Sequence, residues 1–313
     1  MICTTPHLTL ANRWDHLLAR WAINRNGHRV EPGLYVLGNP TPASPVLVTS
    51  NYTLSFDALR TALPNTSAYL LILDTQGINV WCAAGKGTFG TDELVHRIEA
   101  TNLQEVVSHR NLILPQLGAP GVAAHEITKR TGFKVEYGPV RAADLPAYLH
   151  THKATPEMRR VRFTLIDRLT LIPVEFVYAL IPLILVIVLL RSLPAVTAIL
   201  AGTVLFPILL PWLPTHNFST KGFILGVIVT LPFVLSIWMR NPQIAWWLKV
   251  AWCVEELLVF PSITAYVALN FTGSTTFTSR SGVRNEIFAY IPAMAWMFGI
   301  GCVMMFVLSV IKA

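Results

Sequence analysis

The sequence lacks the cysteine pairs that disulfide scaffolds, zinc sites and iron–sulfur clusters need. Its 313 residues hold four cysteines, Cys3, Cys82, Cys253 and Cys302, and no two of them form a CxxC pair. We therefore expect no disulfide framework, zinc site or iron–sulfur cluster in this chain. The first ten residues also lack a basic start followed by an apolar core, so a cleaved signal peptide is not expected.

Charge is scarce in the second half of the chain, where residues 169–313 are overwhelmingly apolar. Apolar segments at about 169–190, 193–213, 222–239, 244–269 and 287–311 are each long enough to cross a bilayer as a helix. The net charge of +7 is not a nucleic-acid signal, because the basic residues gather beside these segments. We therefore predict an all-α transmembrane domain of five helices at 169–313.

A basic linker at 153–168 precedes the apolar half, and its charges are Lys153, Arg159, Arg160, Arg162 and Arg168. If the N-terminus is inside, Lys221, Arg280 and Arg284 join the linker, against Arg191, Arg240 and Lys312 outside. This excess predicts a multi-pass protein of the cytoplasmic membrane with its N-terminal head in the cytoplasm. Charged residues inside the segments, Glu175, Lys249, Glu255 and Glu256, indicate either a transport or relay role or side chains that reach the interface.

Residues 1–152 read as an α/β head. Strand patterns at 46–49, 69–73, 105–108, 112–114 and 133–137 alternate with helical patterns at 55–63, 91–100, 121–130 and 142–149. This alternation predicts a Rossmann-like domain with a mainly parallel sheet. A further helix at 12–25 aligns Trp14, Leu17, Leu18 and Trp21 on one face, which we expect to pack on the head. The alternative is an interfacial helix that lies on the bilayer.

The stretch at 77–90, Gly-Ile-Asn-Val-Trp-Cys-Ala-Ala-Gly-Lys-Gly-Thr-Phe-Gly, carries the chemistry of the head. Gly85, Gly87 and Gly90 formally fit a dinucleotide-binding GxGxxG motif, but the preceding strand ends too early, and a phosphate-binding P-loop does not fit. Cys82 is either a small buried residue or a thiolate, since a helix start and Lys86 both favour its ionised form. A single sulfur suits a soft metal that arrives in its own macrocycle.

The same stretch resembles the cap-helix signature of the HgcA family, the membrane-anchored corrinoid proteins of mercury methylation. Leu47-Val-Thr-Ser-Asn-Tyr52 and Tyr137-Gly-Pro-Val-Arg-Ala-Ala-Asp-Leu-Pro146 resemble two further segments of the corrinoid iron–sulfur proteins of the acetyl-CoA pathway. The resemblance runs from about residue 33 to residue 149. It departs from histidine-ligated B12 proteins, because Asp-x-His-x-x-Gly is absent, and from corrinoid iron–sulfur proteins, because the four-cysteine cluster motif is absent.

The resemblance implies a set of residues around a cobalamin or related corrinoid. Cys82 would be the catalytic residue and the ligand of the corrinoid cobalt. The residues that would bind the cofactor are Thr49, Ser50, Asn51 and Tyr52, then Asn79, Val80, Trp81, Cys82, Ala83, Ala84, Gly85 and Lys86, and finally Gly138, Pro139, Val140, Arg141 and Ala142. Two of these residues have an alternative role without the cofactor. Trp81 could anchor the cap in the core instead of stacking on the corrin, and Lys86 could be solvated instead of pairing with a corrin amide or phosphate.

The resemblance also implies a function, the transfer of a methyl group from cobalt to Hg(II) by a corrinoid-dependent methyltransferase. Implied partners are a ferredoxin-like protein with two [4Fe-4S] clusters (HgcB) as electron donor, a methyl-donor pterin system and the Hg(II) substrate. One alternative is a membrane-tethered corrinoid methyl carrier that serves another acceptor. Another is a transporter with a regulatory head.

Overall fold

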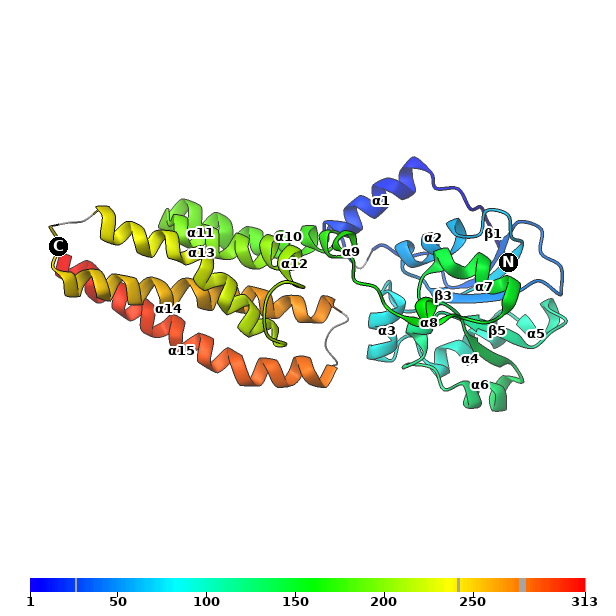
Figure 1. Cartoon of the computed structure of the whole chain (residues 1–313). Coiled ribbons are helices and arrows are strands. Elements are labelled where there is room, and N and C mark those ends of the chain that lie inside the picture. The colour runs from blue at the N-terminus through cyan, green and yellow to red at the C-terminus, as the bar shows by residue number, and fades with distance from the viewer. Residues whose placement is uncertain (26, 241–242, 276–279, 313) are drawn as a thin grey trace. The chain divides into compact units, whose positions relative to one another are not determined.

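The computed structural model describes residues 1–25, 27–240, 243–275 and 280–312. The chain divides into two compact units, Met1–Arg162 and Phe163–Ala313 (Figure 1). The first unit contains every strand of the described residues, and the second is built from helices. The predicted division into an α/β part and a helical part is therefore confirmed at this level.

The first unit is organised by a six-stranded sheet with the order β1-β2-β4-β3-β5-β6. The strands are β1 (Ile2–Thr4), β2 (Gly33–Leu37), β3 (Val46–Ser50), β4 (Ala68–Leu73), β5 (Asn111–Leu114) and β6 (Lys134–Tyr137). All neighbouring pairs are parallel except β2 and β4, which run antiparallel. The predicted mainly parallel sheet is thus present, with one antiparallel neighbour added.

Helices cover both faces of this sheet, so its central strands are apolar throughout. Side chains alternate along a strand, and Val46 and Val48 of β3 pack with one core while Leu47 packs with the other. The first core is closed by α3 (Val80–Lys86), α4 (Thr91–Ala100), α5 (Leu103–Val106) and α6 (Ala124–Thr131), and the second by α2 (Thr53–Thr61) and α7 (Leu145–Thr151). Burial on two faces explains the uninterrupted apolar runs of β3 and β4.

Two local predictions differ from the structure. The segment 105–108 was expected to be a strand, but helix α5 covers its first half, following Asn102 in the left-handed region at φ 49°. A short apolar run cannot by itself distinguish a strand from a buried helical turn, and here Leu103 anchors the turn in the core. Strands β1 and β2 were not predicted, because their pairing is decided by the tertiary fold.

Helix α1 (Leu10–Arg20) begins at Thr9, which forms a capping box with Asn12. Its predicted apolar face does not pack on the head, since Trp14 is 62% and Leu17 45% exposed. Polar contacts hold the helix instead: His16 Nε2 lies 2.7 Å from Asp57 Oδ2. The expectation that this face is buried in the first unit was therefore wrong.

The second unit contains four helices long and apolar enough to span a membrane, by length and composition, among the described residues. They are Leu165–Leu190, Phe218–Arg240, Trp246–Gly273 and Ser281–Ile311. Their elements are α9 (Leu165–Leu169), α10 (Ile172–Leu185), a π-turn (Val186–Leu190), α13 (Phe218–Arg240), α14 (Trp246–Asn270), a 3-10 turn (Phe271–Ser274) and α15 (Arg280–Lys312).

The second of the five predicted spans is shorter than expected, because its apolar helix covers only Leu193–Leu209. It consists of α11 (Leu193–Leu200), a π-turn (Ala201–Leu205) and α12 (Phe206–Leu209). The next residues include Pro211 and Pro214, which cannot donate the backbone hydrogen bonds of a continuing helix. Five full-length spans are thereby corrected to four, with one shorter apolar helix.

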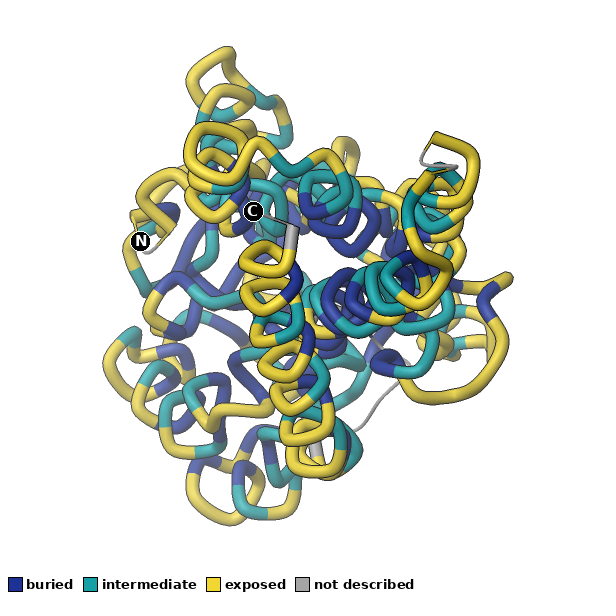
Figure 2. Tube along the Cα trace, turned by 90° about the vertical axis from the view of Figure 1, so that its left-hand side faces the viewer, coloured by how far each residue is buried: buried dark blue, intermediate teal, exposed yellow. Residues whose placement is uncertain are grey.

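Much of the outside of the helical unit is exposed (Figure 2), and large apolar side chains are among its exposed residues. Large side chains such as Ile181, Leu189 and Trp296 are 70–73% exposed. Inside, glycines let helices approach closely: a Cβ on Gly226 of α13 would lie 2.6 Å from Pro261 Cα of α14. Lys249, one of the charged residues within the predicted segments, is buried in this unit, with Nζ 5.5 Å from the centre of the Trp238 ring.

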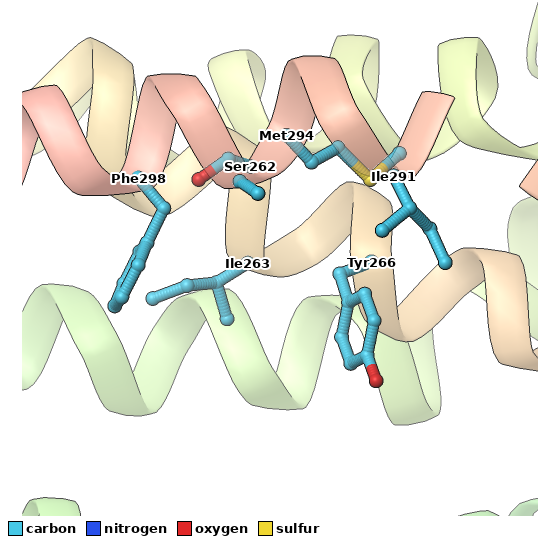
Figure 3. A pocket seen from close by; sticks show the side chains of 7 residues that line it. Ser262, Ile263, Tyr266, Ile291, Met294 and Phe298 are labelled. Atoms are coloured by element: carbon cyan, nitrogen blue, oxygen red, sulfur yellow. The ribbon is translucent and has the colours of Figure 1, made fainter. Parts of the chain in front are cut away.

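A cavity of about 260 Å³ lies between α14 and α15 (Figure 3). Its lining is mainly apolar, with Ile263, Ile291, Met294 and Phe298 among its residues. Ser262 also lines it, but its hydroxyl already donates to Val259 O at 2.7 Å. The cavity therefore lacks the converging polar groups that orient a polar substrate.

Candidate functional site

The predicted site segments gather at one edge of the sheet. Strands β3, β4, β5 and β6 are mutually parallel, so their carboxyl ends meet at the same edge. Residues 49–52 end β3, residues 79–86 follow β4, and residues 138–142 follow β6. The chain leaves β3 toward β4 and then crosses back to β5 on the other side of β3. Open α/β sheets bind ligands outside such a reversal of strand order.

Asn51 organises the loop that leads to helix α3. Its side-chain Oδ1 accepts hydrogen bonds from Thr75 N at 3.0 Å, Thr75 Oγ1 at 2.9 Å and Gly77 N at 3.0 Å. Its Nδ2 donates to Asp74 Oδ1 at 3.1 Å, and the residue is 1% exposed. In this structure the amide of Asn51 therefore holds the 74–77 loop, which fixes where α3 begins.

Helix α3 presents Cys82 on its outer side. Asn79 caps the helix by accepting the backbone N–H of Cys82 at 2.9 Å, so Cys82 stands at the third helical position. Trp81 and Cys82 are half-buried, whereas Gly85 and Lys86 are exposed. The predicted cap helix thus carries an accessible thiol within its first turn, and Lys86 lies in its last turn.

Three residues of α3 that the resemblance placed around the cofactor face the core of the protein. Val80, Ala83 and Ala84 are buried in the first core, with Ala83 0% exposed. Ala84 is small because Gly121 packs against it, and a Cβ on Gly121 would stand 3.0 Å from Ala84 Cα. These three side chains fit the helix onto the sheet, and the outward face is formed by Trp81, Cys82, Gly85 and Lys86.

The glycines of the 85–90 stretch do not form a dinucleotide-binding turn. Gly85 is within α3, Gly87 ends that helix in the left-handed region at φ 87°, and Gly90 precedes α4. The motif needs its glycines between a strand and a helix, whereas here they connect two helices. A nucleotide fingerprint is therefore not formed.

The end of β3 places polar groups beside this helix. Thr49 and Ser50 are buried, and Ser50 Oγ has no hydrogen-bond partner among the described residues. Tyr52, at the start of α2, is near enough to Cys82 for an ionised thiol to act on its phenol. Burial raises the pKa of Tyr52 most, Arg20 and Arg25 oppose this shift, and Asp15 and Cys82 add to it.

Three residues near the site were not singled out from the sequence. Arg20 and Arg25 act on Tyr52, and the hydroxyl Oγ1 of Thr88, just after α3, is buried without a partner. Arg20 ends the amphipathic helix α1 and Arg25 follows it, and basic residues at this end of the helix were the available signal. Nothing in the sequence pattern distinguishes Thr88.

The segment 138–142 makes structural contacts of its own. A Cβ on Gly138 would lie 3.2 Å from Ile113 Cγ2, and Gln116 donates its backbone N–H to Pro139 O. The N–H of Val140 donates to Met158 O at 2.8 Å. Arg141 is exposed, and Ala142 packs against the second core. These residues join the end of β6 to the segment around α8 (Pro156–Arg159).

The described residues contain no group of three or more His, Cys, Asp or Glu side chains that could hold a metal ion. His109 Nε2 contacts Ser44 O, and His125 lies 3.7 Å from Glu126 on the surface. Cys82 is therefore the accessible soft donor at this edge of the sheet, and it acts without neighbouring protein ligands.

Comparison with known proteins relates this unit to one group. A family described as "CO dehydrogenase/acetyl-CoA synthase delta subunit" matches residues 20–149. The gamma subunit of the acetyl-CoA decarbonylase/synthase complex of Methanopyrus kandleri is 34% identical over 127 residues, 40% of this chain and 27% of the relative. The corresponding protein of Archaeoglobus fulgidus is 33% identical over 123 residues, 39% of this chain and 26% of the relative.

A further relative is the corrinoid/iron–sulfur protein large subunit of Moorella thermoacetica, 30% identical over 129 residues, which are 41% of this chain and 28% of the relative. The chain thus spans 26–28% of the length of these three relatives. The likeness to the family covers the strands from β2 to β6, and with them the end of β3, helix α3 and the segment after β6, whereas β1 precedes it. Residues 20–149 are accordingly related to the corrinoid-protein family.

Proposed function

We propose that this protein is a corrinoid-dependent methyltransferase that transfers a methyl group from cobalt to Hg(II). The observation that carries the proposal is the position of Cys82, an accessible thiol at the carboxyl edge of the sheet in a unit related to corrinoid proteins. A soft thiolate is a suitable ligand for a redox-active metal. The relatives' names supply the corrinoid, and the HgcA-like stretch around Cys82 supplies the mercury chemistry.

The residues at the edge of the sheet fit a corrinoid. A flat macrocycle over the outer face of α3 needs room, and a Cβ added to Gly85, one turn beyond Cys82, would have no atom within 4 Å. The buried hydroxyls of Ser50 and Thr88 have no partner in the protein and could bond to polar groups of the macrocycle or its tail. Tyr52 lies in the same neighbourhood.

A bound corrinoid would supply the methyl group to be transferred. Cys82 would hold the corrinoid through its cobalt, and its thiolate would donate electron density to the metal, as a thiolate ligand does for haem iron. Such a donor would favour transfer of the methyl group together with its bonding electrons, as the electrophile Hg(II) requires. Asn79 and Asn51 keep Cys82 in place, the first by capping α3 and the second by holding the loop before it.

The remaining parts of the proposal concern the surroundings of this unit. The helical unit would anchor the protein in the cytoplasmic membrane with the site in the cytoplasm, on the basic-residue excess of the linker side. A ferredoxin-like protein with two [4Fe-4S] clusters would supply electrons, and a methyl-pterin system would supply the methyl group.

A second candidate is a membrane-tethered corrinoid carrier that gives its methyl group to another acceptor. The similarity to subunits of the acetyl-CoA decarbonylase/synthase complex favours it, because none of these relatives is named for mercury. Both candidates need the corrinoid on Cys82. They differ only in the acceptor.

The test is the visible absorption spectrum of the full-length protein reconstituted with cobalamin, compared between the wild type, Cys82→Ala and Cys3→Ala. Cys3 is an exposed cysteine of the same unit and serves as the matched control. We expect a thiolate-ligated spectrum in the wild type and in Cys3→Ala, and its loss in Cys82→Ala. Identical spectra for all three would exclude Cys82 as the ligand. Methylmercury formation from Hg(II) by the methylated protein, absent in Cys82→Ala, then separates the two candidates.

A further inference from the structure

Arg168 of α9 is a buried cation without a partner. The residue is 4% exposed, and its Nε and Nη1 atoms are shielded from solvent without a hydrogen bond. Its side chain contacts Trp212, whose ring centre lies 5.7 Å from the Arg168 Cζ. An aromatic face attracts a guanidinium but accepts none of its in-plane N–H groups in the way that an oxygen does. A buried, unpaired charge is costly, so an anion is needed at this position.

The guanidinium has no oxygen acceptor among the described residues. Its third nitrogen, Nη2, is not among the buried atoms without a partner, and no hydrogen bond or ion pair of the Arg168 side chain is formed with the described residues. A planar fork of N–H donors without such acceptors is the geometry that binds carboxylate and phosphate oxygens.

A second cation is attached to the same turn of the chain. Lys221, in the first turn of α13, donates from Nζ to the carbonyl oxygens of Leu210, at 3.2 Å, and Leu213. These two carbonyls flank Trp212, the residue that Arg168 contacts. An ammonium group has three donors, so one remains for a ligand after these two bonds. Arg168 and Lys221 therefore bracket the 210–213 turn with two positive charges.

Two carboxylates of the helical unit are engaged elsewhere. Asp167 Oδ2 accepts from the backbone N–H and the hydroxyl of Thr164, as the cap of α9. Glu286 of α15 accepts the backbone N–H of Ser219 at 2.5 Å, as the cap of α13. Among the described residues, neither Arg168 nor Lys221 has a carboxylate partner. The positive charge of the pair is left to an external anion.

The position in the bundle indicates which anion this is. Arg168 lies at the start of the first candidate span, and Lys221 near the start of the second. Trp212 is 70% exposed, and tryptophan is typical of the boundary between headgroups and hydrocarbon. Phosphodiesters are the anions present at that depth, and basic sites between helices bind such headgroups. We propose that Arg168 and Lys221, with Trp212 beside them, bind the phosphate of an anionic phospholipid.

The test uses full-length protein in a neutral detergent, with phosphatidylglycerol, phosphatidylcholine or inorganic phosphate as the added probe. Native mass spectrometry counts bound lipid, and the melting temperature reports stabilisation. We expect phosphatidylglycerol to bind in preference to phosphatidylcholine, and Arg168→Gln to weaken it about tenfold, as expected for a charged hydrogen bond. Lys221→Gln should weaken it less. Arg191→Gln, an exposed charge at the other end of the first span, should leave binding unchanged.

Three outcomes would overturn the proposal. The first is equal retention of the two lipids by the wild type. The second is stabilisation by inorganic phosphate equal to that by phosphatidylglycerol, which would assign the site to a free anion. The third is undiminished phosphatidylglycerol binding in Arg168→Gln or, if that variant does not fold, in Lys221→Gln.

Discussion

Strand β4 and helix α10 are both apolar, but β4 is buried within its unit, whereas α10 exposes large apolar side chains. Every residue of β4 is buried, because helices of the same unit pack on both faces of the sheet. On α10, Ile181 is 71% exposed, and in the π-turn that follows it Leu189 is 70% exposed. A six-residue run can be covered by the protein itself, whereas the 26-residue helix that ends at Leu190 is long and apolar enough to cross a bilayer. Length, rather than hydrophobicity, separates the two units.

The largest effect on stability is expected at Leu71 of β4. Leu71→Ala removes a fully buried side chain and should lower the free energy of unfolding of the first unit by about 2–5 kcal/mol. Leu189→Ala should change stability by less than about 0.5 kcal/mol in detergent, because this side chain contacts no protein core. Hydrogen exchange of the detergent-solubilised protein at increasing urea measures both. Equal losses would mean that the outer face of the bundle is covered by protein.

The second largest effect on stability is expected at Asn51, a buried polar residue of the first unit. Asn51→Ala should destabilise it by about 3 kcal/mol, because buried donors of Thr75 and Gly77 lose their acceptor. The same variant should loosen α3 and weaken corrinoid binding. Asn39→Ala, an exposed asparagine, is the control. Unchanged exchange of the 74–79 amides in Asn51→Ala would show that the loop is held by other contacts.

Two glycines at α3 sharpen the distinction between packing and ligand space. Gly121→Ala places a Cβ 2.2 Å from Phe89 O and should cost about 1–3 kcal/mol. Gly85→Ala meets no atom and should stabilise the unbound protein by up to about 1 kcal/mol, because alanine favours a helix. Despite that gain, Gly85→Ala should weaken cobalamin binding. Cobalamin titration and thermal unfolding measured together would refute this if affinity rises with stability.

The smallest effect is expected at helix α1. Trp14→Ala should change the stability of the first unit by less than about 0.5 kcal/mol, because 62% of the side chain is exposed. Urea unfolding checks this value. A loss above about 2 kcal/mol would mean that the apolar face of α1 is covered in solution after all.

The structure brings the three segments predicted to bind the cofactor to one edge of the sheet. The motifs at 49–52, 79–86 and 138–142 follow carboxyl ends of parallel strands. Val80, Ala83 and Ala84 of these segments are buried in the core, and they follow the i, i+3, i+4 spacing of a buried helical face. That spacing was the available signal. It places Cys82 and Gly85 on the outer side.

Local chemistry determined much of this protein from the sequence alone: the alternation of strands and helices, the caps of α3 and α9, and the long apolar helices. These features depend on residues within a few positions of one another. Only the tertiary structure decided the addition of β1 and β2, the exposure of the α1 face, the hold of Asn51 on the 74–77 loop and the unpaired burial of Arg168. Each of these features depends on which distant segment of the chain packs against a residue, and the residues next to it in the sequence do not indicate that.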